Sequence, residues 1–218
     1  MSDQDTSDAI LDAAEELFAK QGFAATTTKQ IGSAAGVNPA LIHYYFGNKE
    51  GLYRALLRRL FESIMARGAE QLATSPPPDA AVRALIGIQS DTMVAHPSFP
   101  RLLARELVDH GMTHAGDSLN RLSETLFRRL CELIQGGQEA GIFRPDMDPR
   151  FAAVSTISLV PYFHIARPVV GVLLDCGPAG PDEAAMRAYG RHAAEFALAA
   201  LAARPDAATA ADPTGSQP

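Results

Sequence analysis

The segment from residue 27 to residue 46 constrains the fold more than any other part of the chain, because it contains the start and stop signals of two short helices. Thr27 and Gln30 have the spacing of a capping box, in which each side chain binds the backbone N–H of the other residue. Ile31 and Ala35 then fall on one face of the helix that this box begins. Gly36 can adopt the left-handed conformation that ends a helix, so the first of the two helices is predicted to stop there.

The second helix of this segment is predicted to span residues 39–46. Asn38 is a favourable N-cap, and the missing N–H of Pro39 costs nothing at the first helical position. The inward face should carry Ile42, Tyr45 and Phe46, and the outer side should carry Asn38, Pro39, Ala40, His43 and Tyr44. A helix with a slim, exposed first turn fits the major groove of DNA, so the segment is predicted to be a helix-turn-helix.

The charge around this segment favours DNA binding over the alternative, which is an ordinary helical hairpin whose His43 and Tyr44 pack at a surface. Between positions 20 and 59 six basic residues face one acidic residue, a local net charge of +5 in a chain of net charge −6. The basic residues are Lys20, Lys29, Lys49, Arg54, Arg58 and Arg59, and the acidic one is Glu50. A basic patch at this place suits the phosphate backbone that a DNA-binding helix approaches.

Residues 8 to about 57 resemble the DNA-binding domain of the TetR family of bacterial repressors, over roughly a quarter of the chain. The resemblance rests on motifs that occur in order: residues 10–18, Gly22-Phe23, Thr26-Thr27, Ile31, Ala35-Gly36-Val37, His43-Tyr44-Tyr45-Phe46 and Lys49-Glu50-Gly51-Leu52. The chain departs from many members at Asn38-Pro39-Ala40 and at His43, so the resemblance does not transfer an operator sequence.

The resemblance implies an all-α homodimeric repressor with a three-helix DNA-binding head. It also implies a larger helical body that binds a small molecule and dimerises through its last two helices. The implied partner is double-stranded DNA with a palindromic operator. The implied DNA contacts are Thr27, Thr28, Asn38, Pro39, Ala40, Leu41, His43, Tyr44, Tyr45 and Lys49.

Apolar periodicity predicts helices throughout the chain, about nine in all. The first ends at Gly22, the fourth runs from residue 49 to about 72, and later ones span about 79–95, 100–110, 118–140, 151–166 and 182–203. The helix at 118–140 should be striped by Leu119, Leu122, Leu126 and Leu133. We expect a head at 1–48 (family domain about 7–67, motif about 27–49), a ligand-binding and dimerisation body at 49–203, and a disordered tail at 204–218.

Composition excludes several other classes of protein. The acidic residues of the first 19 positions contradict a signal peptide, which needs a basic start and an apolar core. Cys131 and Cys176 are too few for a disulfide framework and fit a reducing cytoplasm, where inert thiols are favoured over a redox pair. No nucleophile elbow, zinc-protease motif or Walker loop occurs, so neither an enzyme nor a cofactor is expected. Pro161 and Arg167 favour a buried helix over a membrane span at 151–166.

Polar and aromatic residues within helices five to eight are expected to surround a small apolar or amphipathic effector. They are Met93, His96, Phe99, Leu103, Glu106, His110, Tyr162, Phe163, His164 and Arg167, each of which could instead be an ordinary core residue. Glu106, His110 and His114 could form a metal trio, but Gly111 and Thr113 should end their helix, so no metal site is predicted. The competing function is a DNA-bound protein of the same fold that acts through a protein partner and has no effector.

Overall fold

The computed structural model describes residues 2–177 and 179–203, and its regular elements are all helical. In chain order they are α1 (Asp3–Ala25), α2 (Thr28–Ala35), α3 (Ala40–Phe46), α4 (Lys49–Ala73), α5 (Pro78–Ala95), α6 (Phe99–His110), α7 (Gly116–Leu122), the π-helical η1 (Ser123–Phe127), α8 (Arg128–Glu139), α9 (Pro149–Ile165), α10 (Arg167–Leu173) and α11 (Glu183–Leu201). The all-α prediction is therefore confirmed. The predicted tail at 204–218 lies outside the described residues.

The helices α7, η1 and α8 form one continuous rod, because the residues at both junctions keep right-handed helical dihedral angles. Within residues 2–177 and 179–203 the chain thus makes ten helical rods, one more than the nine or so expected. The additional rod is α10, which follows α9 after a bend of 83°. Pro168 lies in the first turn of α10, where a missing N–H is tolerated.

The segment η1 explains why the predicted leucine stripe of this rod is only partly right. Leu122 and Leu126 are half-buried, but Leu119 is 39% exposed, and Leu133 is not among the fully buried residues. The buried positions of α8 are Leu130, Ile134 and Gly137. A π-helical turn contains an extra residue, so the apolar face beyond it is displaced by about one position relative to a regular α-helix.

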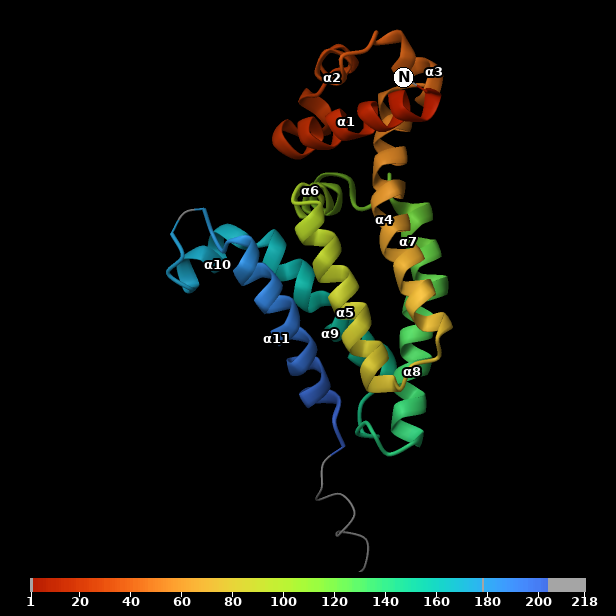
Figure 1. Cartoon of the computed structure of the whole chain (residues 1–218), viewed down its shortest axis with the longest axis vertical. Coiled ribbons are helices and arrows are strands. Elements are labelled where there is room, and N and C mark those ends of the chain that lie inside the picture. Colours follow the sequence, from red (N-terminus) through yellow and green to blue (C-terminus); the bar gives the residue numbers. More distant parts are fainter. Residues whose placement is uncertain (1, 178, 204–218) are drawn as a thin grey trace, which may run out of the picture.

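The helices α1, α2 and α3 form a head at one end of the elongated molecule, and α4 runs from the head down into the body (Figure 1). The core of the head is made by the fully buried side chains of Ile10, Phe18, Ile31, Ile42 and Leu52. Gly22 has φ +83°, which ends the regular part of α1 where the sequence predicted, and the Phe23 ring then stacks on Phe18 with 5.8 Å between centroids.

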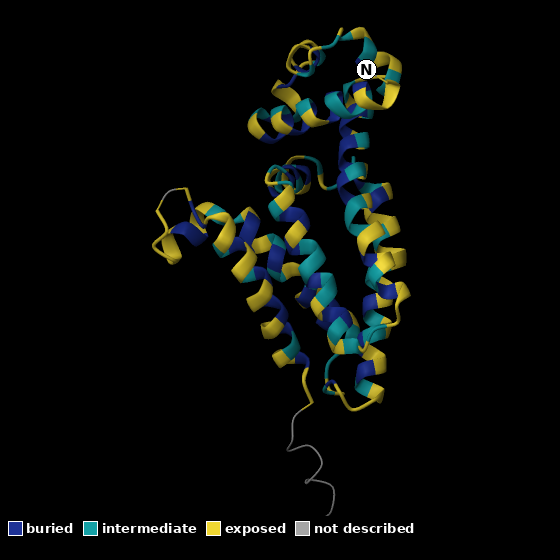
Figure 2. Cartoon of the chain, viewed as in Figure 1, coloured by how far each residue is buried: buried dark blue, intermediate teal, exposed yellow. Residues whose placement is uncertain are grey.

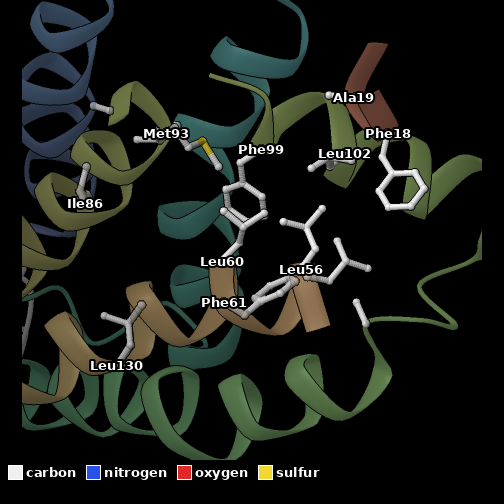
Figure 3. Close-up of a cluster of buried hydrophobic side chains, with 14 of the residues drawn as sticks. Phe18, Ala19, Leu56, Leu60, Phe61, Ile86, Met93, Phe99, Leu102 and Leu130 are labelled. Atoms are coloured by element: carbon white, nitrogen blue, oxygen red, sulfur yellow. The ribbon is translucent and has the colours of Figure 1, made fainter. Parts of the chain in front are cut away.

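The core of the head continues without a break into the body. The helix α6 lies directly beneath α1, and buried positions follow α4 where it passes α6 (Figures 1 and 2). Figure 3 shows Phe18 of α1, Leu102 of α6 and Leu56 of α4 in one apolar cluster that extends to Phe61 and Phe99. A movement of α6 would therefore be transmitted to α1 and α4 through these packed side chains.

The helices α9, α10 and α11 carry large apolar side chains that remain exposed. They include Phe151, Val154, Tyr162, Val169, Val172, Leu173 and Phe196, and we call this set the exposed apolar face of α9–α11. Among the described residues, no one helix has the length and apolar character to cross a membrane. The bent pair α9 and α10 reaches these limits only when its two arms are taken together.

Candidate DNA-binding and effector sites

The start of α2 is fixed by the predicted capping box. The Gln30 N–H donates to Thr27 Oγ1 at 3.2 Å, and the Thr27 N–H donates to Gln30 Oε1 at 2.8 Å. The preceding Thr26 is fully buried and donates its hydroxyl to Gly22 O at 2.7 Å. These bonds attach the beginning of α2 to the end of α1 and leave Thr27 exposed at the surface.

The turn between α2 and α3 has the Schellman arrangement at Gly36, whose φ is +67°. The Val37 N–H donates to Gly32 O at 2.9 Å, and the Gly36 N–H donates to Ser33 O at 3.3 Å. A Cβ at Gly32 would lie 3.0 Å from Pro39 Cγ, so the glycine permits the close approach of the two helices. The predicted helix-turn-helix is present.

The first turn of α3 is held by Asn38, whose Oδ1 accepts the Ala40 N–H at 2.9 Å. The side-chain NH₂ of Asn38 stays available on the exposed side. Tyr44 is 75% exposed, while Ile42 is fully buried against the head core, as the predicted orientation of the helix requires.

His43 is exposed, and its Nδ1 lies 3.0 Å from Gly47 O. A carbonyl oxygen can only accept, so Nδ1 is the protonated nitrogen in the neutral ring. The other nitrogen, Nε2, is then an acceptor on the exposed residue. It can accept from an exocyclic amino group in the major groove, such as adenine N6 or cytosine N4.

The structure divides the ten expected DNA-contact residues by exposure. Half-buried positions are Thr28, Pro39, Leu41, Tyr45 and Lys49, and exposed positions are Thr27, Asn38, Ala40, His43 and Tyr44. Tyr45 donates its hydroxyl to Asp3 Oδ1 at 3.0 Å, so this side chain joins α3 to the start of α1.

Lys49 has a role that its assignment as a phosphate contact did not include. Its ammonium group donates to Phe23 O at 2.9 Å and to Thr26 O at 3.0 Å, and it lies 4.4 Å from the centre of the Phe23 ring. Carbonyl groups at a helix end attract a cation because they lack helical partners. Lys49 therefore fastens α4 to the end of α1, and at most one of its three N–H donors is left for a phosphate.

Fewer than six basic residues of the patch are free to attract DNA, because some of them form ion pairs with carboxylates. Arg54 pairs with Glu50 at 2.8 Å, and Arg59 pairs with Asp12 at 2.8 Å and with Glu15 at 3.3 Å. The cations of the patch that have no ion pair within the described residues, and are exposed, are Lys20, Lys29 and Arg58.

The contact between head and body is partly polar. The buried carboxylate of Glu15 on α1 lies between Arg59 of α4 and His96, whose Nδ1 is 3.8 Å away. Tyr53 of α4 is buried beside Glu106 of α6, and burial, followed by the Glu106 carboxylate, raises the pKa of the Tyr53 phenol. These groups connect α1, α4 and α6 at one junction.

The body contains an apolar cavity of about 230 Å³. Its walls come from α4 to α9, with Phe61 of α4, Met93 of α5 and Phe99 and Leu103 of α6 on one side. Additional lining residues are Ile64, Leu85, Ile86, Ile88, Gln89, Met112, Leu119, Leu122, Leu126, Phe127, Leu130, Thr156, Ile157 and Pro161. The cavity exceeds the about 150 Å³ at which an apolar protein cavity already binds benzene.

The lining carries no charged side chain and only two polar side chains, Gln89 and Thr156. Gln89 Nε2 donates to Ile157 O at 3.1 Å, and the Thr156 hydroxyl donates to Ala152 O at 2.8 Å. The Thr156 hydroxyl proton and one of the two Gln89 N–H donors are thus engaged. The cavity suits an apolar group that carries few polar atoms.

The structure brings three of the ten expected effector residues to this cavity, namely Met93, Phe99 and Leu103. The other seven lie outside this cavity. Tyr162 is 62% exposed, His96 faces Glu15, and Glu106 and His110 lie at the junction below the head. Phe163 stacks on Tyr189 and lies edge-on to His164, and Arg167 donates to Pro181 O at 3.0 Å.

The lining residues of α4, of the α7–α8 rod and of α9 were not predicted from the sequence, nor were those of α5 other than Met93. Leu119, Leu122 and Leu126 were predicted as an apolar stripe but were not assigned to an effector site. An apolar residue beside a cavity has the same sequence pattern as one packed in a filled core, so no local signal separates them.

Comparison with known proteins agrees with both parts of the structure. The model of the bacterial regulatory proteins of the tetR family matches residues 10–56, and the tetracyclin repressor-like C-terminal domain matches residues 78–196. The second match alone spans more than half of the chain.

Individual relatives are transcriptional regulators. The chain is 34% identical over 164 residues to the HTH-type transcriptional repressor NicS of Pseudomonas putida, covering 74% of this chain and 77% of NicS. It is 30% identical to the repressor KstR2 of Rhodococcus jostii over 66% of this chain and 70% of KstR2. In fold it is similar to the regulator FadR from Bacillus subtilis in complex with stearoyl-CoA, with a TM-score of 0.69 at 18% identity, covering 88% of this chain and 98% of FadR.

Proposed function

Because the chain belongs to the TetR family of bacterial transcriptional regulators, we propose that it binds a palindromic operator as a homodimer and is released from it by a small apolar effector. The coarser function, a DNA-binding transcriptional regulator rather than an enzyme, follows from the family itself. The observation that carries the proposed release is the apolar cavity in the body, one wall of which is α6.

For the operator contact, α3 is the proposed recognition helix. His43 would read one base pair through its acceptor nitrogen, and Asn38 and Tyr44 are exposed beside it. The phosphate backbone would be contacted by the start of α2, through Thr27, Thr28 and Lys29. The exposed cations Lys20 and Arg58 would make further phosphate contacts. Replacing His43 with Ala should cost roughly 1 to 3 kcal/mol at one base-pair position.

For the dimer, the exposed apolar face of α9–α11 is the proposed interface. A single recognition helix makes few contacts, so two copies reading a two-fold site supply the affinity. The half-sites should lie about 34 to 36 Å apart, or slightly more. A footprint without dyad symmetry would contradict this arrangement.

For the effector, the lining of the cavity favours a molecule with a large apolar part. FadR from Bacillus subtilis was determined with stearoyl-CoA, whose acyl chain has this character. The cavity of the present chain has no charged side chain to receive a charged group, so such a group would remain outside it.

Release would act through α6. Phe99 and Leu103 of this helix line the cavity, and the helix lies beneath α1 (Figure 1). An effector that displaces α6 would shift α1 and α4, and with them the spacing of the two recognition helices. It must bind the released state more tightly, with a coupling of about 1 to 3 kcal/mol, or about 5- to 150-fold in operator affinity.

The test is an operator titration of the full-length dimer with and without long-chain acyl-CoA thioesters, free fatty acids and steroid ketones. We expect Leu103→Phe, which fills the cavity, to leave operator affinity unchanged and to raise the effector concentration needed for release by about tenfold, or 1.4 kcal/mol. Leu107→Phe is the matched control, because Leu107 lies on the same helix but is 59% exposed.

Two results would count against effector-driven release. In one, Leu103→Phe responds like the Leu107→Phe control, which moves the effector out of the cavity. In the other, no compound of the panel changes operator affinity while DNA binding persists, which favours the alternative of a DNA-bound protein that acts through a protein partner.

A further inference from the structure

A buried carboxylate and two imidazoles meet where α6 ends below the head. Glu106 is fully buried, and His110 and His114 are half-buried. One potential ligand atom of each residue lies within 4.8 Å of the other two. This cluster is separate from the apolar cavity, since none of its three residues lines that cavity.

The local backbone explains why the three side chains converge. Glu106 and His110 are four residues apart on the last turn of α6, which ends at Gly111 as expected from the sequence. Gly111 and Met112 both have positive φ, +56° and +65°, so the chain reverses immediately after the helix. His114 returns toward α6, and its backbone N–H donates to Glu106 Oε1 at 2.7 Å.

The sequence analysis excluded a metal trio because the helix should stop before His114. The helix does stop there, but the chain reversal after it brings His114 beside Glu106 and His110, as a continued helix would have done. The premise was right and the conclusion drawn from it does not follow.

The donor set has the chemistry of a site for a transition-metal ion. Two imidazoles and one carboxylate are ligands that Zn²⁺ accepts, and three protein ligands leave a fourth position open. A tetrahedral ion with bonds of about 2.0 to 2.1 Å holds its ligands about 3.4 Å apart. The three potential ligand atoms lie within 4.8 Å of one another, so the side chains need to approach one another to hold such an ion.

The charge at the site also favours a cation. Glu106 is wholly removed from solvent, and within the described residues its one ion-pair partner is His114, with Nδ1 at 3.1 Å from Oε2. The His110 ring makes aromatic contacts, and its two nitrogens have no hydrogen bond among the described residues, so they are available. A buried carboxylate with no Lys or Arg partner gains from a metal ion that neutralises it.

Aromatic rings from the head and from α4 surround the cluster. The His114 ring lies 5.3 Å from those of Phe23 and Tyr53, and the His110 ring lies edge-on to Phe23 at 5.8 Å. Apolar walls strengthen electrostatic attraction inside the site by excluding water. An ion bound here would fix the turn after α6 against both α1 and α4.

We propose that Glu106, His110 and His114 bind one divalent transition-metal ion of the Zn²⁺ class at the junction between head and body. The site is independent of the apolar effector, and it stands or falls separately from effector-driven release. It would make the position of α6 beneath the head sensitive to metal supply.

The test uses the untagged full-length protein, stripped with EDTA and dialysed into chelator-free buffer. Zn²⁺ is titrated by calorimetry, and Co²⁺ replaces it for visible absorption spectroscopy. We expect saturation at one ion per chain and the intense visible bands of tetrahedral Co²⁺. His110→Phe keeps the ring contacts and removes the ligand atoms, so it should weaken binding at least about 10- to 100-fold and abolish these bands. His43→Phe is the control, since His43 is exposed on α3.

Two outcomes overturn the proposal: wild-type protein that shows no saturable Zn²⁺ binding, or His110→Phe that binds as tightly as wild type. Unfolding curves of the metal-free variants identify a folding defect. If His110→Phe does not fold, Glu106→Gln replaces it, because the amide keeps the shape and the acceptor oxygen of the carboxylate but loses its charge. A Glu106→Gln protein that binds Zn²⁺ as tightly as wild type would likewise overturn the proposal.

Discussion

Replacing Lys49 with Met distinguishes a structural role, in which the ammonium group ties α4 to the end of α1, from a role as a phosphate contact. The first role predicts a loss of stability, and the second predicts a loss of salt-dependent operator binding. Met retains much of the apolar stem and removes the ammonium group, and with it the bonds to Phe23 O and Thr26 O. Hydrogen bonds to charged groups contribute about 1.5 to 3 kcal/mol each, which we reduce to about 1 because Lys49 is partly solvated. The contact with the Phe23 ring adds about 0.5 to 1 kcal/mol.

The free energy of unfolding should therefore fall by about 2 to 3 kcal/mol, which for a chain of this size lowers Tm by about 4 to 12 °C. The assay is thermal unfolding at fixed protein concentration, since a dimer's Tm depends on concentration. The matched control is Lys29→Met on α2, because Lys29 is exposed and without an ion pair within the described residues. That variant should keep its Tm and lower the salt slope of operator binding by about one unit. If Lys49→Met instead keeps the wild-type Tm and loses one unit of salt slope, Lys49 is a phosphate contact and our reasoning about its carbonyl bonds is wrong.

Three further predictions concern the turn, a buried histidine and the dimer. Gly36→Val should abolish folding of the head and with it operator binding, because a β-branched side chain resists the left-handed conformation at φ +67°; wild-type operator affinity would contradict this. His164 Nε2 is buried and has no hydrogen bond within the part of the chain that the structure describes, and burial, with a smaller contribution from Arg167, lowers the pKa of the ring. Below the ordinary histidine pKa of about 6.5, the ring is protonated in the unfolded chain but stays neutral in the folded chain. The free energy of unfolding therefore falls as the pH drops below this value. His164→Phe should lose less stability than wild type between about pH 7 and pH 5 in urea unfolding, and equal losses would remove His164 as the cause. Leu173→Glu on the exposed apolar face of α9–α11 should give monomers in sedimentation at micromolar concentration, and an unchanged dimer would place the interface elsewhere.

The head could be predicted from the sequence because each of its determinants is local. The capping box of Thr27 and Gln30, the left-handed Gly36 and the cap at Asn38 all lie within a few residues of the structure that they specify. Such signals need no knowledge of distant partners. For Lys49 the position was predicted but the contacts were not, because its carbonyl partners lie 23 and 26 residues earlier in the chain.

The sites of the body could be predicted only in part, because they depend on how helices pack. Met93, Phe99 and Leu103 were found, whereas Tyr162 was expected in the cavity and lies exposed on the bent α9–α10 pair. The bend lies at Ala166, and Pro168 in the first turn of α10 is the local sequence signal beside it. Likewise, the return of His114 to Glu106 depends on a positive φ at Met112, which is uncommon for a residue other than glycine.

The continuous core between head and body limits how hybrid regulators can be built from this chain. A transplant of residues 1–48 onto a foreign body would separate Phe18 from Leu102 and Glu15 from Arg59, although the cut falls neatly before α4. In the transplanted head, the carboxylate of Glu15 would lack the cation of Arg59, and the ring of Phe18 would lose its packing against Leu102. A portable recognition unit must therefore bring with it the first half of α4 and the facing side of α6, so specificity for DNA and the proposed response to an effector would be inherited together.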